Sequence, residues 1–305
     1  MNRILVPCMA VMVLCAHLLA GTASGAEAMK LVYAASLYAD EKGVGLSRPD
    51  GAGCAGGTIL VVADTGNGRL LSYAYQQSML RFTGEVKLPE LTAPSKVQIN
   101  SKGEILALDE KQRRIVRVSR EGALLGIVAA TGMPVNAASM TPRSFAVDAG
   151  DRLYVLDIAA DRIVVLEPSG AFVRAIAYPA DHGFLSDVAV DSSGTVYAID
   201  PVQARVFSAA PAAPALTPLS PPLREHVRFP ASITVDEKDW LWVVDRNGGI
   251  LVVLDRSGSL QAKYLDHGWR EGQLRYPSQA CVAAPGTLFV ADRENHRVQV
   301  FTVVR

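Results

Sequence analysis

The sequence predicts an all-β fold, a six-bladed β-propeller of four-stranded antiparallel blades, and three observations lead to it. An apolar strand that ends in aspartate recurs six times, at intervals of 45, 48, 43, 45 and 47 residues. A proline stands 15 residues before this aspartate in five of the six copies. Each copy holds short strand-forming runs separated by Gly, Asp and Ser turns. A period of about 40 to 50 residues with about four strands per unit is typical of a propeller.

The chain begins with a segment typical of a secretory signal. Arg3 gives a basic start, residues 4–20 are largely apolar, and residues 24–26 are small, as a signal peptidase requires. We therefore expect a signal peptide over residues 1–26 and a periplasmic or secreted mature protein.

The alternative for this segment is an uncleaved membrane anchor. Pro7 and His17 interrupt its apolar run, which favours a cleaved signal. The remaining residues, 27–305, then form one propeller domain. Because no other apolar run reaches the roughly 20 residues that a membrane-spanning helix needs, we expect no transmembrane anchor in the mature chain.

The N-terminal end of the domain is expected to close the ring. Residues 30–37 have strand character, and the last copy ends after its third strand, residues 298–304. Pairing the two would supply the missing outer strand of the last blade and remove an open seam.

The fifth copy illustrates the four strands of a unit. We expect the inner strand over residues 233–235, the second over 240–244, the third over 250–254 and the outer strand over 260–264. Their β-branched and aromatic residues favour strands, and the intervening Asp, Ser and Gly residues favour turns.

In five copies an arginine follows the aspartate five residues later, and two interpretations are open. The pairs could form a ring of charge around one mouth of the central channel, or each aspartate could accept backbone N–H groups in its own hairpin and pair with the arginine to fix the register. A feature shared by every unit favours the structural role. The pairs are Asp64 and Arg69, Asp109 and Arg114, Asp157 and Arg162, Asp200 and Arg205, and Asp292 and Arg297.

These units resemble the NHL repeat family of six-bladed propellers. The sixth copy carries the resemblance best, with the glycine-to-proline segment 267–277 followed by the strand and Asp-Arg-Glu-Asn-His-Arg hairpin of 288–301, and the hairpin after Asp64 is nearly as close. The resemblance covers essentially the whole mature chain and implies the fold. It leaves the activity open, because such propellers include RNA binders, protein-interaction modules, sensors and some enzymes.

The connections that should surround one mouth of the channel are rich in arginine and aromatic residues. Such a mouth suits a carboxylate, a phosphate or an acidic peptide. The alternative is a set of solvated turns whose arginine stems cover apolar surface. The candidate binding residues are Arg48, Arg143, Arg228, Trp269, Arg270, Arg275 and Tyr276, and the hairpins add Arg113, Arg246 and Arg293.

The overall charge argues against nucleic acid as a partner. The 30 basic and 30 acidic residues balance, and nucleic-acid binders usually carry a basic excess. We expect an exported protein- or ligand-binding scaffold in the cell envelope, with another envelope or secreted protein or a peptide as its partner.

An enzyme is the competing class, specifically a metal-assisted lyase or hydrolase with its site at the channel mouth. A lyase that resembles this fold holds zinc with histidines, and His182, His226 and His267 would have to supply such a set here. The sequence contains no haem-attachment motif, nucleophile elbow or phosphate loop. Nothing in it specifies a catalytic residue, a metal or a cofactor, and binding is the preferred hypothesis.

Two cysteines remain after removal of the signal. Cys54 and Cys281 fall on the expected inner strands of blades one and six, which are neighbours in a closed ring. An exported protein permits a disulfide between them, and two separately buried thiols are the alternative.

Overall fold

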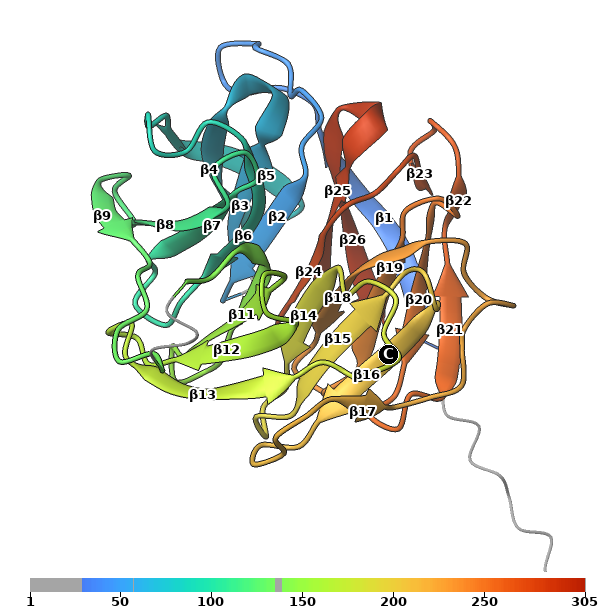
Figure 1. Ribbon diagram of the computed structural model, residues 1–305. Coiled ribbons are helices and arrows are strands. Elements are labelled where there is room, and N and C mark those ends of the chain that lie inside the picture. Colours follow the sequence, from blue (N-terminus) through green and yellow to red (C-terminus); the bar gives the residue numbers. More distant parts are fainter. Residues whose placement is uncertain (1–28, 57, 135–138, 305) are drawn as a thin grey trace, which may run out of the picture.

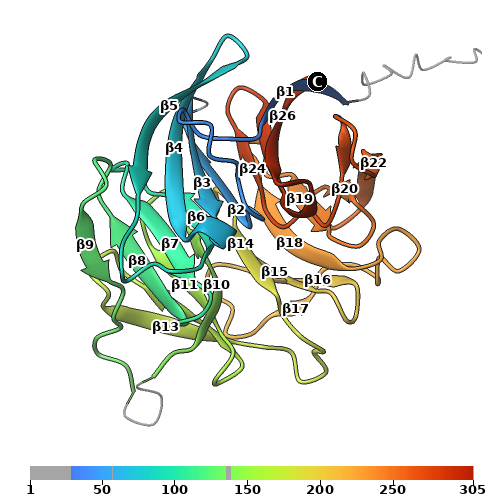
Figure 2. The ribbon, with the colours of Figure 1, turned by 90° about the horizontal axis from the view of Figure 1, so that it is seen from above.

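The computed structural model describes residues 29–56, 58–134 and 139–304, whose main strands form six four-stranded antiparallel sheets. The sheets follow one another around a ring in chain order, as the view from above shows (Figure 2). The predicted six-bladed propeller is confirmed. The expected signal peptide lies outside the described residues.

The first three blades each use four consecutive strands. Blade 1 contains β2 (Gly51–Ala55), β3 (Ile59–Asp64), β4 (Arg69–Gln76) and β5 (Met79–Val86). Blade 2 contains β6 (Pro94–Ile99), β7 (Ile105–Asp109), β8 (Arg114–Val118) and β9 (Leu124–Ile127). Blade 3 contains β10 (Pro142–Val147), β11 (Leu153–Asp157), β12 (Arg162–Leu166) and β13 (Phe172–Ala177).

Blades 4 and 5 continue the pattern. Blade 4 contains β14 (Asp187–Val190), β15 (Val196–Asp200), β16 (Arg205–Ala209) and the very short β17 (Thr217–Pro218). Blade 5 contains β18 (Pro230–Val235), β19 (Leu241–Asp245), β20 (Ile250–Leu254) and β21 (Leu260–Tyr264).

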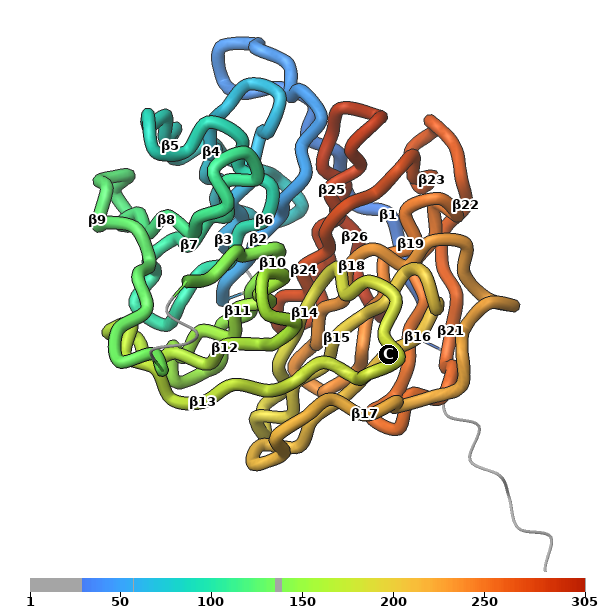
Figure 3. The backbone as a smooth tube through the Cα atoms, viewed as in Figure 1, coloured from blue at the N-terminus to red at the C-terminus, as the bar shows by residue number. Residues whose placement is uncertain are grey.

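Blade 6 joins the two ends of the chain. Its strands are β24 (Ala280–Ala283), β25 (Thr287–Asp292), β26 (Arg297–Val304) and, at the outer edge, β1 (Lys30–Leu37). β1 runs antiparallel to β26, from Lys30 opposite Val304 to Leu37 opposite Val298, and the two segments lie side by side in Figure 3. The predicted closure by an N-terminal strand is confirmed.

The core consists of six apolar clusters, one at each boundary between neighbouring blades of the described chain. At the boundary of blades 2 and 3, for example, Leu106 and Ile115 belong to the same cluster as Phe145 and Val155. Neighbouring blades cover both faces of each sheet, so all five residues of β11 are buried. For the same reason the strand lacks the alternation of apolar and polar residues that a half-exposed sheet shows.

A disulfide links the inner strands where the ring closes. It joins Cys54 of β2 to Cys281 of β24, with the two Cα atoms 5.9 Å apart. It therefore ties blade 1 to blade 6 independently of the β1–β26 pairing.

The remaining elements are small. The turns η1 (Thr65–Asn67) and η3 (Arg293–Asn295) follow the second strands of blades 1 and 6, and β22 (Asp266–His267) pairs in parallel with β23 (Gln273–Leu274) before blade 6. Among the described residues, no helix is long and apolar enough to cross a membrane.

Candidate functional site

The repeated aspartates fix the connections between blades. All six are fully buried at the end of a second strand. Each accepts a hydrogen bond from the backbone N–H of a residue 16 or 17 positions earlier, on the connection that enters the same blade. The donors are Ser47, Thr92, Thr141, Gly183, Arg228 and Arg275.

The arginines that follow these aspartates divide into two groups. In blades 1, 3 and 6 the arginine Nε donates to the aspartate, over 2.8, 2.9 and 2.7 Å respectively. In blade 2, Arg114 instead donates to the backbone oxygen of Glu90, and in blade 4 the buried Nε of Arg205 has no hydrogen-bond partner among the described residues. Hairpin register is the same in both groups, since Asp109 and Asp200 still lie opposite Arg114 and Arg205. The shared feature is therefore the aspartate rather than the ion pair.

A cavity of about 180 Å³ lies where the inner strands begin, at the end of the channel that the repeated aspartates surround. Its charged lining comes from all six blades. The residues are Asp50 of blade 1, Lys96 and Glu110 of blade 2, Arg143 of blade 3, Asp187 of blade 4, Arg246 of blade 5 and Arg293 of blade 6. We call this space the mouth cavity.

Lys96 and Asp187 form the floor of the mouth cavity and neutralise each other. The Lys96 ammonium forms an ion pair with Asp187 across the channel and also donates to Ser144 Oγ over 3.0 Å. Asp187 accepts further hydrogen bonds, including one of 2.6 Å from Ser232 Oγ. Both charges are buried, and a buried charge is tolerated only when it is paired and hydrogen-bonded in this way.

The other charges of the mouth cavity are less completely paired. Arg293 Nε lies 2.7 Å from Asp50 Oδ1, which forms a second ion pair. The Nε atoms of Arg143 and Arg246 are buried but have no hydrogen-bond partner among the described residues. The Arg143 guanidinium lies 5.4 Å from the centre of the Phe184 ring, a favourable contact that gives its Nε no acceptor.

Burial changes the acid–base properties of this cluster. It raises the pKa of Asp50, although the charges of Arg293 and Arg246 oppose the shift. It also lowers the pKa of Arg246, with Arg293 and Arg143 acting in the same direction and Asp50 against it. A guanidinium remains charged in proteins, so Arg246 is a poorly solvated cation that would gain from an anionic partner.

The structure separates the binding residues that the sequence suggested. Only Arg143 of the seven candidates lines the mouth cavity. The others are exposed on connections, with Trp269 at 75% and Tyr276 at 43% exposure. Those near blade 6 are Arg48, Trp269, Arg270, Arg275 and Tyr276, and Arg228 lies on the connection that enters blade 5.

Hydrogen bonds and a ring contact bring several of these exposed residues close to the hairpin of blade 6. The backbone N–H of Arg48 donates to His296 Nδ1, and the N–H of Glu294 in the same hairpin donates to the backbone oxygen of Arg275. The rings of Tyr276 and His267 meet edge to face. These residues form a basic, aromatic outer surface, while the cavity itself is made by others.

Sequence reasoning missed Asp50, Glu110 and the Lys96–Asp187 pair. A usable signal was present, because Glu110, Arg246 and Arg293 each directly follow a repeat aspartate. This position holds five different residue types in the six blades, unlike the invariant aspartate before it. The crossing of Lys96 to Asp187 depends on ring closure and has no local signature.

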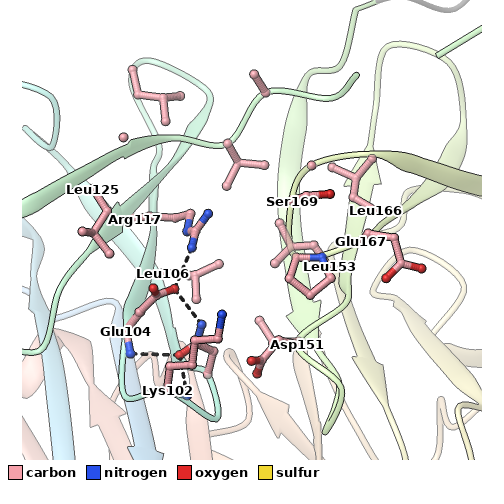
Figure 4. A pocket seen from close by; sticks show the side chains of 18 of the residues that line it. Lys102, Glu104, Leu106, Arg117, Leu125, Asp151, Leu153, Leu166, Glu167 and Ser169 are labelled. Carbon is pink, nitrogen blue, oxygen red and sulfur yellow. Dashed lines mark hydrogen bonds and ion pairs between the residues drawn. The ribbon is translucent and has the colours of Figure 1, made fainter. Parts of the chain in front are cut away.

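A second cavity, of about 250 Å³, lies between blades 2 and 3 (Figure 4). Leu106, Leu125 and Leu153 give it an apolar lining. Glu104 accepts hydrogen bonds from Arg117 (2.7 Å) and Asn100 (2.8 Å), and the bond from Arg117 is the main cause of its lowered pKa. Because its central carboxylate is already satisfied, this cavity has less capacity to bind a charged group than the mouth cavity.

The three histidines considered as zinc ligands have separate surroundings. His182 Nδ1 lies 2.8 Å from the backbone oxygen of Pro179, and the His267 ring packs against Tyr276. The backbone N–H of His226 donates to the backbone oxygen of Leu223 over 2.7 Å. In the part of the chain that the structure describes, no group of three or more His, Cys, Asp or Glu residues is arranged to hold a metal ion.

Comparison with known families bears on the repeat. Residues 274–301 match the family model of the NHL repeat. The sixth unit is an NHL repeat. This NHL unit contains β25, most of β26 and the buried Asp292–Arg297 pair of the hairpin between them. A comparison with curated proteins found no match to this sequence.

Solved structures with the same fold have different activities. Virginiamycin B lyase from Staphylococcus aureus aligns with a TM-score of 0.62 at 14% identity, over 90% of this chain and all of the lyase. A gluconolactonase from Xanthomonas campestris aligns with a TM-score of 0.62 at 15% identity, over 90% of this chain and 89% of the other. A chain of the nidogen/laminin complex aligns with a TM-score of 0.60 at 16% identity, over 82% and 99%. At these identities the likeness concerns the fold alone.

Proposed function

We propose that this chain is an exported binding propeller that captures a carboxylate-bearing ligand, or such a group of another envelope or secreted protein or peptide, at its mouth cavity. One observation carries the proposal: Arg143 and Arg246 have buried Nε atoms with no hydrogen-bond partner among the described residues. Guanidinium groups bind carboxylates through parallel hydrogen bonds, and a desolvated guanidinium gains most from one. A bound carboxylate would supply the missing acceptors.

The exposed surface beside the cavity supports a larger partner. Trp269 and Tyr276 offer aromatic faces, and Arg270 and Arg275 offer cations on the same connection. Aromatic residues and arginine are enriched in protein interfaces. We place the body of a partner here and its carboxylate in the mouth cavity.

Export is part of the proposal. The basic start, apolar run and small residues of segment 1–26 support secretion or residence in the periplasm. Fractionation of cells that express the full chain tests it. Recovery of a shortened mature protein outside the cytoplasm would support export, and an unprocessed cytoplasmic chain would contradict it.

Calorimetric titration with pentanoate tests the binding function. We expect the wild-type protein to bind it and Arg246→Gln to weaken the affinity at least tenfold. Arg81→Gln, which removes an exposed arginine from the outer strand β5, is the matched control and should leave the affinity unchanged. Absence of binding to the wild-type protein, or equal binding by Arg246→Gln, would refute the proposal.

The likeness to a lyase and a lactonase motivates the enzymatic alternative, a metal-assisted lyase or hydrolase at the same mouth. Metal analysis of the purified protein separates the two. Stoichiometric zinc or calcium that is lost with His226→Ala or His267→Ala would favour the enzyme. A defined envelope partner whose capture is lost with Arg270→Ala and Arg275→Ala would favour the scaffold.

A further inference from the structure

The charges of the mouth cavity that remain after internal pairing have both signs. Lys96 is paired with Asp187, and Arg293 with Asp50. Arg143 and Arg246 remain as cations. Glu110 remains as an anion, because its exposed side chain forms no hydrogen bond or ion pair with the described residues. The open charges are therefore two guanidinium groups and one carboxylate.

Glu110 and Arg246 occupy the same position in two different blades. Each directly follows a repeat aspartate, and the backbone N–H of each donates to the oxygen 17 residues earlier, Ala93 and Phe229 respectively, over 2.9 Å in both cases. Equivalent backbone contacts give the two residues equivalent places in their blades.

Blades 2 and 5 are three places apart in a ring of six, so they face each other across the channel. Glu110 and Arg246 both line the mouth cavity but form no ion pair with each other. The cavity thus has a free carboxylate on one side and a free guanidinium on the opposite side, with Arg143 of blade 3 also available to an anion. A plain carboxylate would satisfy only the cationic side.

We infer that the mouth cavity binds a small zwitterion, which places its carboxylate on Arg246 and Arg143 and its ammonium group on Glu110. The inference rests on the proposed carboxylate-binding function and adds the second charge. The volume of about 180 Å³ admits a group about as large as an amino acid. An ion pair at each end would fix the ligand's orientation and length, which a single carboxylate contact cannot do.

The test compares probes that differ only in the ammonium group. Wild-type protein is titrated at low ionic strength with 4-aminobutyrate, 5-aminopentanoate and 6-aminohexanoate, and with butyrate, pentanoate and hexanoate. At least one amino acid should bind at least tenfold more tightly than the carboxylate of the same length. Glu110→Gln should abolish this preference without weakening carboxylate binding, and Arg246→Gln should weaken both.

Glu237→Gln is the matched control, since it removes an exposed carboxylate from the turn between β18 and β19 rather than from the mouth. It should keep the preference. Urea denaturation of each variant confirms that it folds, which is expected for Glu110→Gln because the side chain is exposed.

The outcomes separate the two proposals. Equal or tighter binding of the plain carboxylates, or a preference that survives Glu110→Gln, overturns the zwitterion but leaves the carboxylate site intact. Failure of every carboxylate and amino acid to bind overturns both. A peptide of five alanines followed by a C-terminal lysine presents an ammonium group and a carboxylate at the same chain end. If it binds more tightly than the free amino acids, the zwitterion belongs to a partner's C-terminus, and if less tightly, to a free small molecule.

Discussion

Two adjacent positions of each blade, the repeat aspartate and the residue that follows it, behave in opposite ways. The aspartate is identical in all six copies, fully buried and hydrogen-bonded to the backbone. The next residue is different in kind around most of the ring: Thr65, Glu110, Ile158, Pro201, Arg246 and Arg293. The three charged residues among them, Glu110, Arg246 and Arg293, all line the mouth cavity. The comparison teaches that repetition marks the shared turn, whereas an asymmetric site must be sought where the copies differ.

The largest effect is expected from the aspartates. Asp157→Ala removes the acceptor for the N–H of Thr141 and leaves Arg162, which is buried, without its carboxylate. Removal of one partner from a buried ion pair costs about 3–5 kcal/mol. Urea denaturation should show a loss of this size in the free energy of unfolding.

Asp245→Ala is the matched comparison, because Ile250 stands opposite Asp245 in place of an arginine. The variant loses the hydrogen bonds from the backbone N–H groups of Arg228 and Phe229, but it deprives no arginine of a carboxylate partner. The expected loss is about 1–3 kcal/mol, the cost of unsatisfied buried donors. Equal losses in the two variants would show that the arginine pair adds nothing to the hairpin.

A change of opposite sign is expected at the mouth cavity. Arg246→Met removes a guanidinium whose Nε is buried without a hydrogen-bond partner among the described residues and keeps much of the side-chain volume. Since an unpaired buried charge opposes folding, the unfolding free energy should rise by about 1 kcal/mol. A loss as large as that of Asp157→Ala would instead make Arg246 a structural residue and remove the contrast between the two positions.

The sequence predicted the fold more fully than the site for a physical reason. The blades and their order follow from local patterns repeated at a fixed period, and the closure by residues 30–37 follows from the outer strand that the last copy lacks. The mouth cavity combines single side chains from distant blades. Arg143 and Arg246 could be suspected from their connections, but the pairing of Lys96 with Asp187, 91 residues away, depends on how the ring closes. No local pattern encodes that distance.

The smallest expected effect concerns pH, and it contrasts one aspartate from each region. At Asp109, burial acts to raise the pKa, but hydrogen bonds from the N–H groups of Gln112, Ala93 and Thr92 outweigh it and lower the pKa from its ordinary value of 3.8. The folded state then binds the proton less tightly than the unfolded state. The contribution of Asp109 to stability is therefore present above about pH 4 and is lost as the pH falls through the lowered pKa.

At Asp50 the direction is reversed, because burial raises its pKa despite Arg293 and Arg246. Its contribution favours the fold below the unfolded pKa and declines as the pH rises through the raised value. Unfolding free energies measured from pH 3 to 7 should give two difference curves. Wild type minus Asp109→Asn should rise with pH, and wild type minus Asp50→Asn should fall. If both curves rose with pH, hydrogen bonds rather than desolvation would dominate at Asp50 as they do at Asp109, and the mouth cavity would hold its carboxylate as the repeat does.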